Sequence, residues 1–285
     1  MKIAGRTSGI FAAVLFAAGI GALCLLASAG PTFAETGAVD PLSQGQAGTP
    51  VQIEATQGIE WRRNDKAYIA RGDATATRGD LKVRADALTA RYRDKTDGGT
   101  EIYQIEADGG VVLTQPGRTI YGAHAIYNLD TRTLTMTGGN LRVVTAKETV
   151  TARDQLEYRE RERIVIAQGD VVVESGLRRI GADHMTGHFD RLADGSLNLA
   201  RIEAEGNITV KTKNTFARSQ KGDYDLVKDI MTLTGDVRIT NGQNQFNGER
   251  AEVNVATGVS TLTGGGDGKV KSLIMPSSSG SSSTP

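Results

Sequence analysis

The stretch "VIAQGDVVVESGLRRIGADHM" (residues 165–185) holds two apolar segments, one centred on a Gly-Asp pair and the next on an Ala-Asp pair. A segment of the same form, "LTGDVRITNGQNQFNGERAEV", recurs at residues 233–253. Self-similarity at a regular spacing is the signature of a repeat architecture, in which each unit is one supersecondary element. The chain is therefore expected to be an array of such units.

Each unit is marked by an aromatic residue and by a glycine that follows it. The glycines are Gly72, Gly109, Gly139, Gly169, Gly206 and Gly235, and the aromatic markers are Trp61, Tyr92, Tyr127, Tyr158, Phe189 and Tyr224. The marker precedes its glycine by 11, 17, 12, 11, 17 and 11 residues. The two longer gaps hold Gly- and Asp-rich insertions at 94–99 and 191–196, a composition typical of turns. Without these insertions the period is about 30 residues, enough for a pair of strands.

Apolar and polar side chains alternate on both sides of each glycine, which is the period of a β-strand with one buried face. Residues 51–275 contain a single proline, Pro116, and many Val, Ile and Thr residues, as expected for consecutive strands. A glycine in the middle of an apolar row predicts a bulge or a sharp bend. Stacked bent hairpins would form a long trough with an apolar interior. The interior row is expected to comprise Ile105, Val111, Leu113, Leu141, Val143, Val165, Val171, Val173, Ile202, Ile208, Val210, Leu233, Val237 and Ile239.

The two ends of the chain differ in composition from the repeats. Residues 1–34 have a basic start, an apolar run and the small-residue ending Thr32-Phe33-Ala34, so we expect a secretory signal cleaved after Ala34. Residues 35–50 are predicted to be a flexible lead-in, 51–265 the folded domain, and 266–285 a low-complexity Ser-rich tail. The one cysteine, Cys24, would leave with the signal, as suits an oxidising compartment.

Little in the sequence points to catalysis, and we expect no enzyme, cofactor or metal site. His184 and His188 would stand roughly 13 Å apart on a strand, too far to share an ion. Asp86, Asp154 and Asp183 recur with the repeat, which indicates a structural role. The 33 basic residues balance the 33 acidic ones, so the charge does not suggest nucleic-acid binding. Arg178 and Arg179 are candidate phosphate contacts.

The segment "VQIEATQGIEWRRNDKAYIARGDATATRGDLKVRADALTARY" (51–92) has the order I-x-A … W … A-x-x-x-G-[DN] … [IV]-x-A-D-x-L-x-x-x-Y. Together with the signal and the later units, this order resembles the OstA/LptA family of periplasmic lipopolysaccharide transport proteins. The resemblance covers about residues 51–265. It implies one elongated, slightly twisted, V-shaped β-jelly roll of consecutive antiparallel strands.

The resemblance also implies a function. The interior row would bind the acyl chains of the lipid A part of lipopolysaccharide. The N-terminal edge of the sheet would pair with an LptC-like inner-membrane protein and the C-terminal edge with an LptD-like outer-membrane protein. Head-to-tail self-association through the same edges is a further expectation.

Three alternatives stay open at the level of sequence. One is an LptC-like member of the family that keeps its N-terminal segment as an inner-membrane tether. Another is a β-helix acting on polysaccharide, although the recurring acidic residues and the repeat length of about 30 residues favour hairpins. The third is a structural protein that assembles through its open edges.

Overall fold

The computed structural model describes residues 51–274, apart from residues 97, 194, 255, 256, 258, 266 and 267. The expected signal and lead-in, with Cys24, lie outside the described residues, as do the last eleven residues of the tail. In the described part, the secondary structure consists of β-strands and turns, without a helix. Accordingly, none of the described segments is a helix long and apolar enough to cross a bilayer.

The strands follow one another along the chain at intervals set by short turns. They are β1 (Gln52–Glu54), β2 (Ile59–Arg62), β3 (Ala67–Arg78), β4 (Leu81–Asp94), β5 (Thr100–Gln115), β6 (Arg118–Asn128), β7 (Thr133–Thr137), β8 (Arg142–Thr145), β9 (Thr149–Thr151), β10 (Gln155–Arg159), β11 (Ile164–Ser175), β12 (Arg178–Arg191), β13 (Leu197–Lys211), β14 (Thr215–Asp225), β15 (Ile230–Asn241), β16 (Asn244–Asn254), β17 (Ser260–Thr263) and β18 (Lys271–Leu273).

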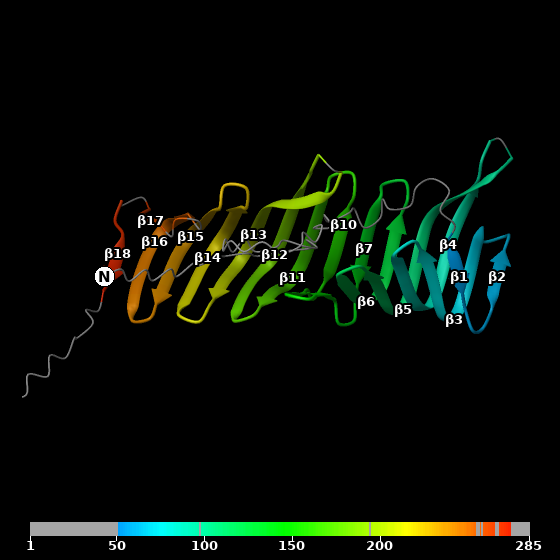
Figure 1. Ribbon diagram of the computed structural model, residues 1–285, viewed down its shortest axis with the longest axis horizontal. Coiled ribbons are helices and arrows are strands. Elements are labelled where there is room, and N and C mark those ends of the chain that lie inside the picture. The colour runs from blue at the N-terminus through cyan, green and yellow to red at the C-terminus, as the bar shows by residue number, and fades with distance from the viewer. Residues whose placement is uncertain are drawn as a thin grey trace, which may run out of the picture.

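All these strands belong to one sheet, in which each long strand is antiparallel to the long strand that follows it in a hairpin. The molecule is accordingly long and narrow, and the strands run in order from β1 and β2 at one end to β17 and β18 at the other (Figure 1). The expected all-β jelly roll of consecutive antiparallel strands is confirmed. Its last strand, β18, lies beyond residue 265, where the sequence placed the start of the tail.

The long strands bend at the glycine that marks each repeat. In β11 the pairing with β12 shifts register between Gln168 and Val171, and the two residues between them, Gly169 and Asp170, have φ angles of 81° and 44°. Two successive residues in the left-handed region turn the strand sharply, and Gly followed by Asp, Asn or Gly tolerates this conformation best. The predicted bend is confirmed. The same bend occurs at Gly72-Asp73, Gly109-Gly110, Gly206-Asn207 and Gly235-Asp236.

At four places the bent strand is divided into two short strands. β1 and β2 pair with different halves of β3, so that Gln52 lies opposite Thr77 and Ile59 lies opposite Ala70. The pairs β7/β8, β9/β10 and β17/β18 have the same relation to β6, β11 and β16. Each pair takes the place of one bent strand. The strand halves on the two sides of the bends form two arms that run along the length of the sheet.

The two insertions seen in the sequence lie where turns were expected. They form the tips of the β4–β5 and β12–β13 hairpins, where the amide of Lys95 bonds to the carbonyl of Gly99 and the amide of Leu192 to that of Ser196. The β4–β5 hairpin projects well beyond its neighbours in Figure 1. The insertions therefore lengthen two hairpins without interrupting the order of the strands.

Candidate functional site

The inner faces of the two arms form a continuous apolar interior that follows the long axis. Most residues of the expected interior row are buried there, each with at most 5% of its surface exposed. These are Val111, Leu113, Leu141, Val143, Val165, Val171, Val173, Ile202, Ile208, Val210, Leu233 and Val237. They belong to one contiguous hydrophobic cluster that extends from β3 to β16. Alternation along the strands therefore placed this row on the correct face.

Two members of the expected row are not buried. Ile239 is only half-buried and packs against the edge of the cluster. Ile105 is 37% exposed, although it shares its face with the buried Ala107 two residues further along β5. Its cross-strand neighbours are Ala90 on β4 and Tyr127 on β6. The pairing of β4 with β5 shifts register just beyond Ala90, between Arg91 and Tyr92. Ile105 therefore lies on the expected face but is not buried.

Several interior residues were not anticipated from the glycine-centred pattern. Met136, Leu156 and Met185 are all at most 3% exposed, and Met136 lies between Ala125 and Leu156 in the sheet. They occupy strands that precede or follow those with the most regular pattern. Their alternation with polar neighbours was the available signal, and counting it on every strand would have found them.

The outer face carries ion pairs between neighbouring strands. On β4 and β5, the Arg91 guanidinium donates to both carboxylate oxygens of Glu106, with Nε–Oε1 2.6 Å and Nη2–Oε2 3.1 Å. These bonds lower the pKa of Glu106 below its ordinary value. On β12, Arg179 pairs with Glu174 of β11, Nη1–Oε1 2.6 Å. The arms thus have an apolar inner face and a charged outer face, as the sequence predicted.

Of the two candidate phosphate contacts in the β11–β12 hairpin, Arg179 lies on this outer side. Arg178 alternates with it and shares the face of Ile180, which packs against the interior cluster. Arg179 is engaged with Glu174, and its side chain is 60% exposed. The charge of Arg178 acts on Glu148, whose pKa is nevertheless raised because burial outweighs the bond from Ser175 and this charge. Both arginines already have acidic neighbours in the protein, and contact with phosphate stays a prediction.

The histidines of β12 do not assemble a metal site. His188 lies beside Glu203 of β13, Nε2–Oε2 3.2 Å, and His184 pairs across the sheet with Gln168 and Glu205. Among the described residues, no three potential ligands come close enough to hold an ion. The recurring Asp residues, in turn, lie against the glycine bends, as Asp183 does at Gly206.

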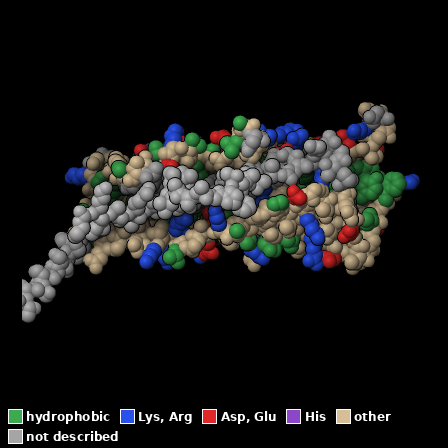
Figure 2. Space-filling model, in the orientation of Figure 1, with side chains coloured by type: hydrophobic (Ala, Val, Ile, Leu, Met, Phe, Trp, Pro, Cys, Tyr) green, Lys and Arg blue, Asp and Glu red, His purple; other side chains and the backbone are tan. Residues whose placement is uncertain are grey.

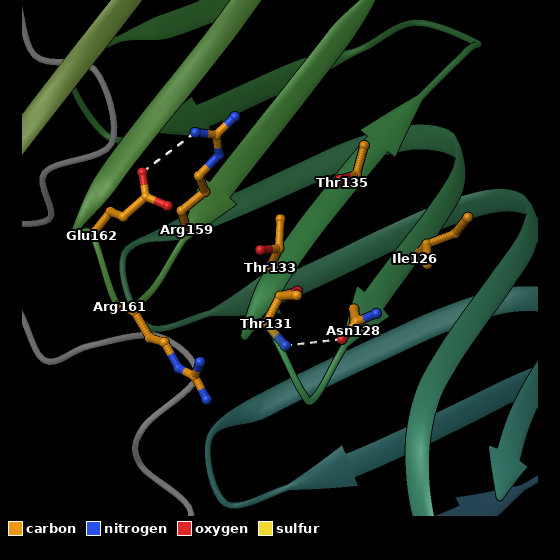
Figure 3. Close-up of a pocket in the computed structure, with 8 residues that line it drawn as sticks. All are labelled: Ile126, Asn128, Thr131, Thr133, Thr135, Arg159, Arg161 and Glu162. Atoms are coloured by element: carbon orange, nitrogen blue, oxygen red, sulfur yellow. Dashed lines mark hydrogen bonds and ion pairs between the residues drawn. The ribbon is translucent and has the colours of Figure 1, made fainter.

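A shallow hollow of about 460 Å³ lies on the outside of the sheet, where the β6–β7 turn meets the β10–β11 turn (Figure 3). It is lined by Ile126, Asn128, Thr131, Thr133, Thr135, Arg159, Arg161 and Glu162. Arg159 bonds to Glu162 at 3.3 Å and to Glu157 at 2.5 Å, so its charge is balanced by neighbouring carboxylates. The hollow marks the middle of the sheet and is separate from the apolar interior.

Within residues 51–274, the apolar interior is open at both ends of the sheet. At the first end, Ile59 is 56% exposed and Trp61 54%, although they lie opposite the inward-facing Ala70 and Tyr68. Figure 2 shows hydrophobic side chains gathered at this end. Trp61 stacks on Tyr68 with ring centroids 5.9 Å apart and donates a hydrogen bond from Nε1 to Tyr92 Oη, 2.9 Å. At the other end Leu273 and Ile274 are equally exposed.

The interior has few groups that could perform acid, base or nucleophilic chemistry. Its buried members in the described part are mainly aliphatic and aromatic, with Ser219 of β14 opposite Ile208. The ion pairs described above lie on the outer face. Such a surface favours other apolar groups, and its two open ends leave backbone groups of β1, β2, β17 and β18 on one side without a strand among the described residues. The arrangement therefore fits binding of apolar chains and pairing with further strands.

Comparison with known proteins is consistent with this geometry. The profile of a family described as "LptA/(LptD N-terminal domain) LPS transport protein" matches residues 52–154 and again residues 149–259. Among solved structures, the chain is similar to LptH, "the LptA homologous periplasmic component of the conserved lipopolysaccharide transport device from Pseudomonas aeruginosa". The identity is 18% and the TM-score 0.39, over 45% of this chain and 95% of that one. No curated protein sequence matches the chain.

Proposed function

This chain belongs to the family of LptA and LptD N-terminal domain LPS transport proteins, and on that premise we propose that it is a periplasmic, non-catalytic carrier of lipopolysaccharide. The acyl chains would lie against the inner faces of the two arms, and the sugars and phosphates would stay in water. The observation that carries this proposal is the apolar interior, one hydrophobic cluster that extends from Ala70 on β3 to Ala251 on β16.

The driving force would come from burial of the acyl chains. Each methylene that leaves water contributes about 0.8 kcal/mol. The interior is well packed, so an acyl chain must separate side chains of the two arms as it enters. A row of Val, Ile and Leu residues of similar size provides many comparable contacts and no deep pocket, which suits a path along which the lipid moves.

The entry points for lipid are proposed to be the places where the inner face is already exposed. Ile102, opposite the buried Tyr92, is 42% exposed, and Ile105 is 37% exposed. Both lie on β5, close to the first open end of the interior. An acyl chain can contact these side chains before the arms separate, which lowers the cost of entry.

The partners are proposed to bind at the two ends of the sheet by strand pairing. An LptC-like inner-membrane protein would extend the sheet at β1 and β2, and an LptD-like outer-membrane protein would extend it at β17 and β18. Strand pairing at an open edge satisfies backbone hydrogen bonds and joins the apolar interiors of the two proteins. The exposed Ile59 and Trp61 at one end, and Leu273 at the other, support such contacts.

Photo-crosslinking in living cells tests the proposal. A photoreactive residue replaces either Ile105 or Ile126, which are on adjacent strands and are 37% and 45% exposed. Ile105 faces inward with Tyr127 as its neighbour, whereas Ile126 lies opposite Glu106 on the outer face. Lipopolysaccharide adducts are expected at position 105 and not at 126. Equal adducts at both, or none at 105 in folded and exported protein, would refute the proposal.

A further inference from the structure

The chain contains two copies of one unit, and the offset between them is constant. The family profile matches twice in succession. The bends at Gly72 and Gly169, and the aromatic residues Trp61 and Tyr158, are each 97 residues apart. Residue for residue, therefore, β9 and β10 in the middle of the sheet correspond to β1 and β2 at its end. The middle of the molecule contains an internal example of how this edge is covered.

The hairpin turns that follow these strands have the same backbone structure. In the first, the amide of Lys66 bonds to the carbonyl of Arg63 at 3.2 Å, and in the second the amide of Arg163 bonds to that of Glu160 at 3.2 Å. Lys66 and Arg163 have φ angles of 48° and 55°. Position 63 at the end of the sheet is therefore structurally equivalent to position 160 in the middle.

The two copies differ in what covers them. Leu156 and Tyr158 on β10 are 3% and 8% exposed, because β7 pairs with β10. Their equivalents, Ile59 and Trp61 on β2, are 56% and 54% exposed, because among the described strands β2 pairs only with β3. An edge with this apolar pattern is complete only when a strand equivalent to β7 lies beside it.

In the middle of the sheet the two neighbouring turns are joined by a buried carboxylate. Glu160 is 8% exposed and accepts a bond from Arg132 Nη1 at 3.0 Å and from Tyr127 Oη at 3.2 Å. Its amide also bonds to the Arg132 carbonyl at 3.0 Å. Figure 3 shows the turn after Asn128 beside the turn that holds Arg161 and Glu162. Here the turn after β10 supplies the acid, and the turn before β7 supplies the base.

At the end of the sheet the charge at this position is reversed. Arg63 replaces the acid, and its guanidinium carbon lies over the Trp61 ring, 4.4 Å from the centroid. We propose that Arg63 selects the partner at the β1/β2 edge: the partner is a strand of this fold whose preceding turn carries an Asp or Glu where this chain has Arg132. This inference rests on the edge pairing of the proposed function and names the chemistry of its partner.

The fold accepts an acid at the position that the partner would use. In the second copy the equivalent of Arg132 is Asp229, and both residues have a φ of 55°. The turns begin alike, since the amide of Thr131 bonds to Asn128 Oδ1 and that of Lys228 to Asp225 Oδ1. An Asp or Glu in this turn therefore meets Arg63 without a change of backbone.

The other end of the same chain does not supply this acid. After β16, the amide of Thr257 bonds to Asn254 Oδ1 as in the other turns, and the amide of Asn254 bonds to the Val259 carbonyl. The sequence of residues 254–259, NVATGV, has Gly258 where the others have Arg132 and Asp229. Head-to-tail pairing of two copies would therefore bring to Arg63 a segment that contains no Asp or Glu. The β1/β2 edge thus favours a different protein over a second copy of this chain.

Grafted turns in the full-length protein test the role of Arg63. One variant carries the Asp225–Ile230 turn, DLVKDI, in place of residues 254–259, and a second carries the Asn128–Thr133 turn, NLDTRT. Sedimentation velocity at low and high salt measures head-to-tail association. The DLVKDI graft is expected to associate at least tenfold more tightly than the wild type, and this gain disappears with Arg63→Glu but persists with Arg63→Lys. The NLDTRT graft should gain affinity only when combined with Arg63→Glu.

A double-mutant cycle inside the sheet tests the same charge pairing through stability, even if neither graft associates. Glu160→Arg places at the internal junction the residue that the open edge carries, and it should lower stability in urea unfolding. Adding Arg132→Asp should recover most of the loss. No recovery, or grafts whose association ignores the charge at position 63, would overturn the role of Arg63. Neither result depends on lipid, so lipopolysaccharide crosslinking at position 105 separately decides the proposed function.

Discussion

The carboxylate of Asp86 on β4 occupies the space that a side chain at Gly109 on β5 would need. A Cβ added at Gly109 would overlap Asp86 Oδ2. Asp154 has the same relation to Gly169, and Asp183 to Gly206. The acidic residues that recur in the sequence therefore cover the bend of the neighbouring strand, and they leave no room for a side chain at these three glycines. At Gly72 and Gly235 the same space is taken by Gln57 and Gln220.

Substitution of the two bend glycines of β5 should have opposite results. Gly109→Ala forces a side chain into a left-handed conformation and against Asp86, and it should lower the free energy of unfolding by about 2–4 kcal/mol. Gly110→Asn is expected to be nearly neutral, because an added Cβ meets nothing within 4 Å and Asn occupies the equivalent position at residue 207. Urea unfolding measures both. A Gly109→Ala/Asp86→Ala double variant should recover part of the loss, and equal losses at 109 and 110 would contradict the account.

Neighbouring valines of β11 should respond differently to a polar substitution. Val171 is 1% exposed within the interior, whereas Val172 is half-buried on the outer face. Val171→Asn loses apolar burial and buries an amide, so it should cost about 3–5 kcal/mol. Val172→Asn should cost about 1 kcal/mol or less. Thermal and urea unfolding of the two variants test the face assignment, which fails if Val172→Asn is the more damaging change.

Acid should weaken the protein partly through Glu106. The bonds from Arg91 lower the pKa of Glu106 in the folded state, so the stability that they confer is present above the ordinary pKa of about 4.3 and is lost as pH falls through the lowered value. Glu106→Gln should therefore be less stable than the wild type at neutral pH and show a shallower loss of stability in acid. Urea midpoints measured from pH 7 to pH 3 test this slope.

Glu148 provides a test of the opposite sign. Burial raises its pKa, so the stability linked to its protonated form is present below the ordinary pKa and is lost as pH rises through the raised value. Glu148→Gln should be more stable relative to the wild type at pH 7 than at pH 4. Urea midpoints at these two pH values measure the difference. An unchanged difference would mean that Glu148 is not held in this environment in solution.

Equivalent aromatic residues at the end and in the middle of the sheet should differ in importance. Tyr158 is covered by β7, and Tyr158→Ser should cost about 3 kcal/mol or more in urea unfolding. Trp61 is 54% exposed, and Trp61→Ser should cost only about 1 kcal/mol, through its contacts with Tyr68 and Tyr92. In cells, Trp61→Ser should instead reduce crosslinking between the β2 edge and the partner protein proposed to bind there. A similar loss of stability in both variants would show that β2 is not an open edge.

Local patterns were sufficient to predict the strands, the bends and the inner face. Alternation around Gly169 places Val165, Val171 and Val173 on one side, and all three are buried. The Gly-Asp pair predicted a bend, and the φ angles of Gly169 and Asp170 confirm it. These features depend on residues close together in sequence, because strand alternation and left-handed turns are properties of a few consecutive residues.

The positions that the sequence pattern misjudged depend on neighbouring strands. Ile105 satisfies the same alternation as Ala107, yet it is 37% exposed, and this exposure depends on the surrounding strands and not on its own sequence. The offset of 97 residues was present in the spacing of the glycines, but its meaning depends on the structure. Only the structure shows that β10 is covered by β7, whereas its equivalent β2 is exposed at the end of the sheet.

What the sequence by itself determined is the repeat, and with it the bent antiparallel hairpin, the apolar face and the family. Tertiary structure alone decided which interior side chains are covered, that Glu160 is buried against Arg132, and that its equivalent Arg63 lies at an open edge. The reason is physical. The conformation of a strand follows from its own residues, whereas burial and ion pairing follow from the strand beside it, which is distant in the chain or belongs to another protein.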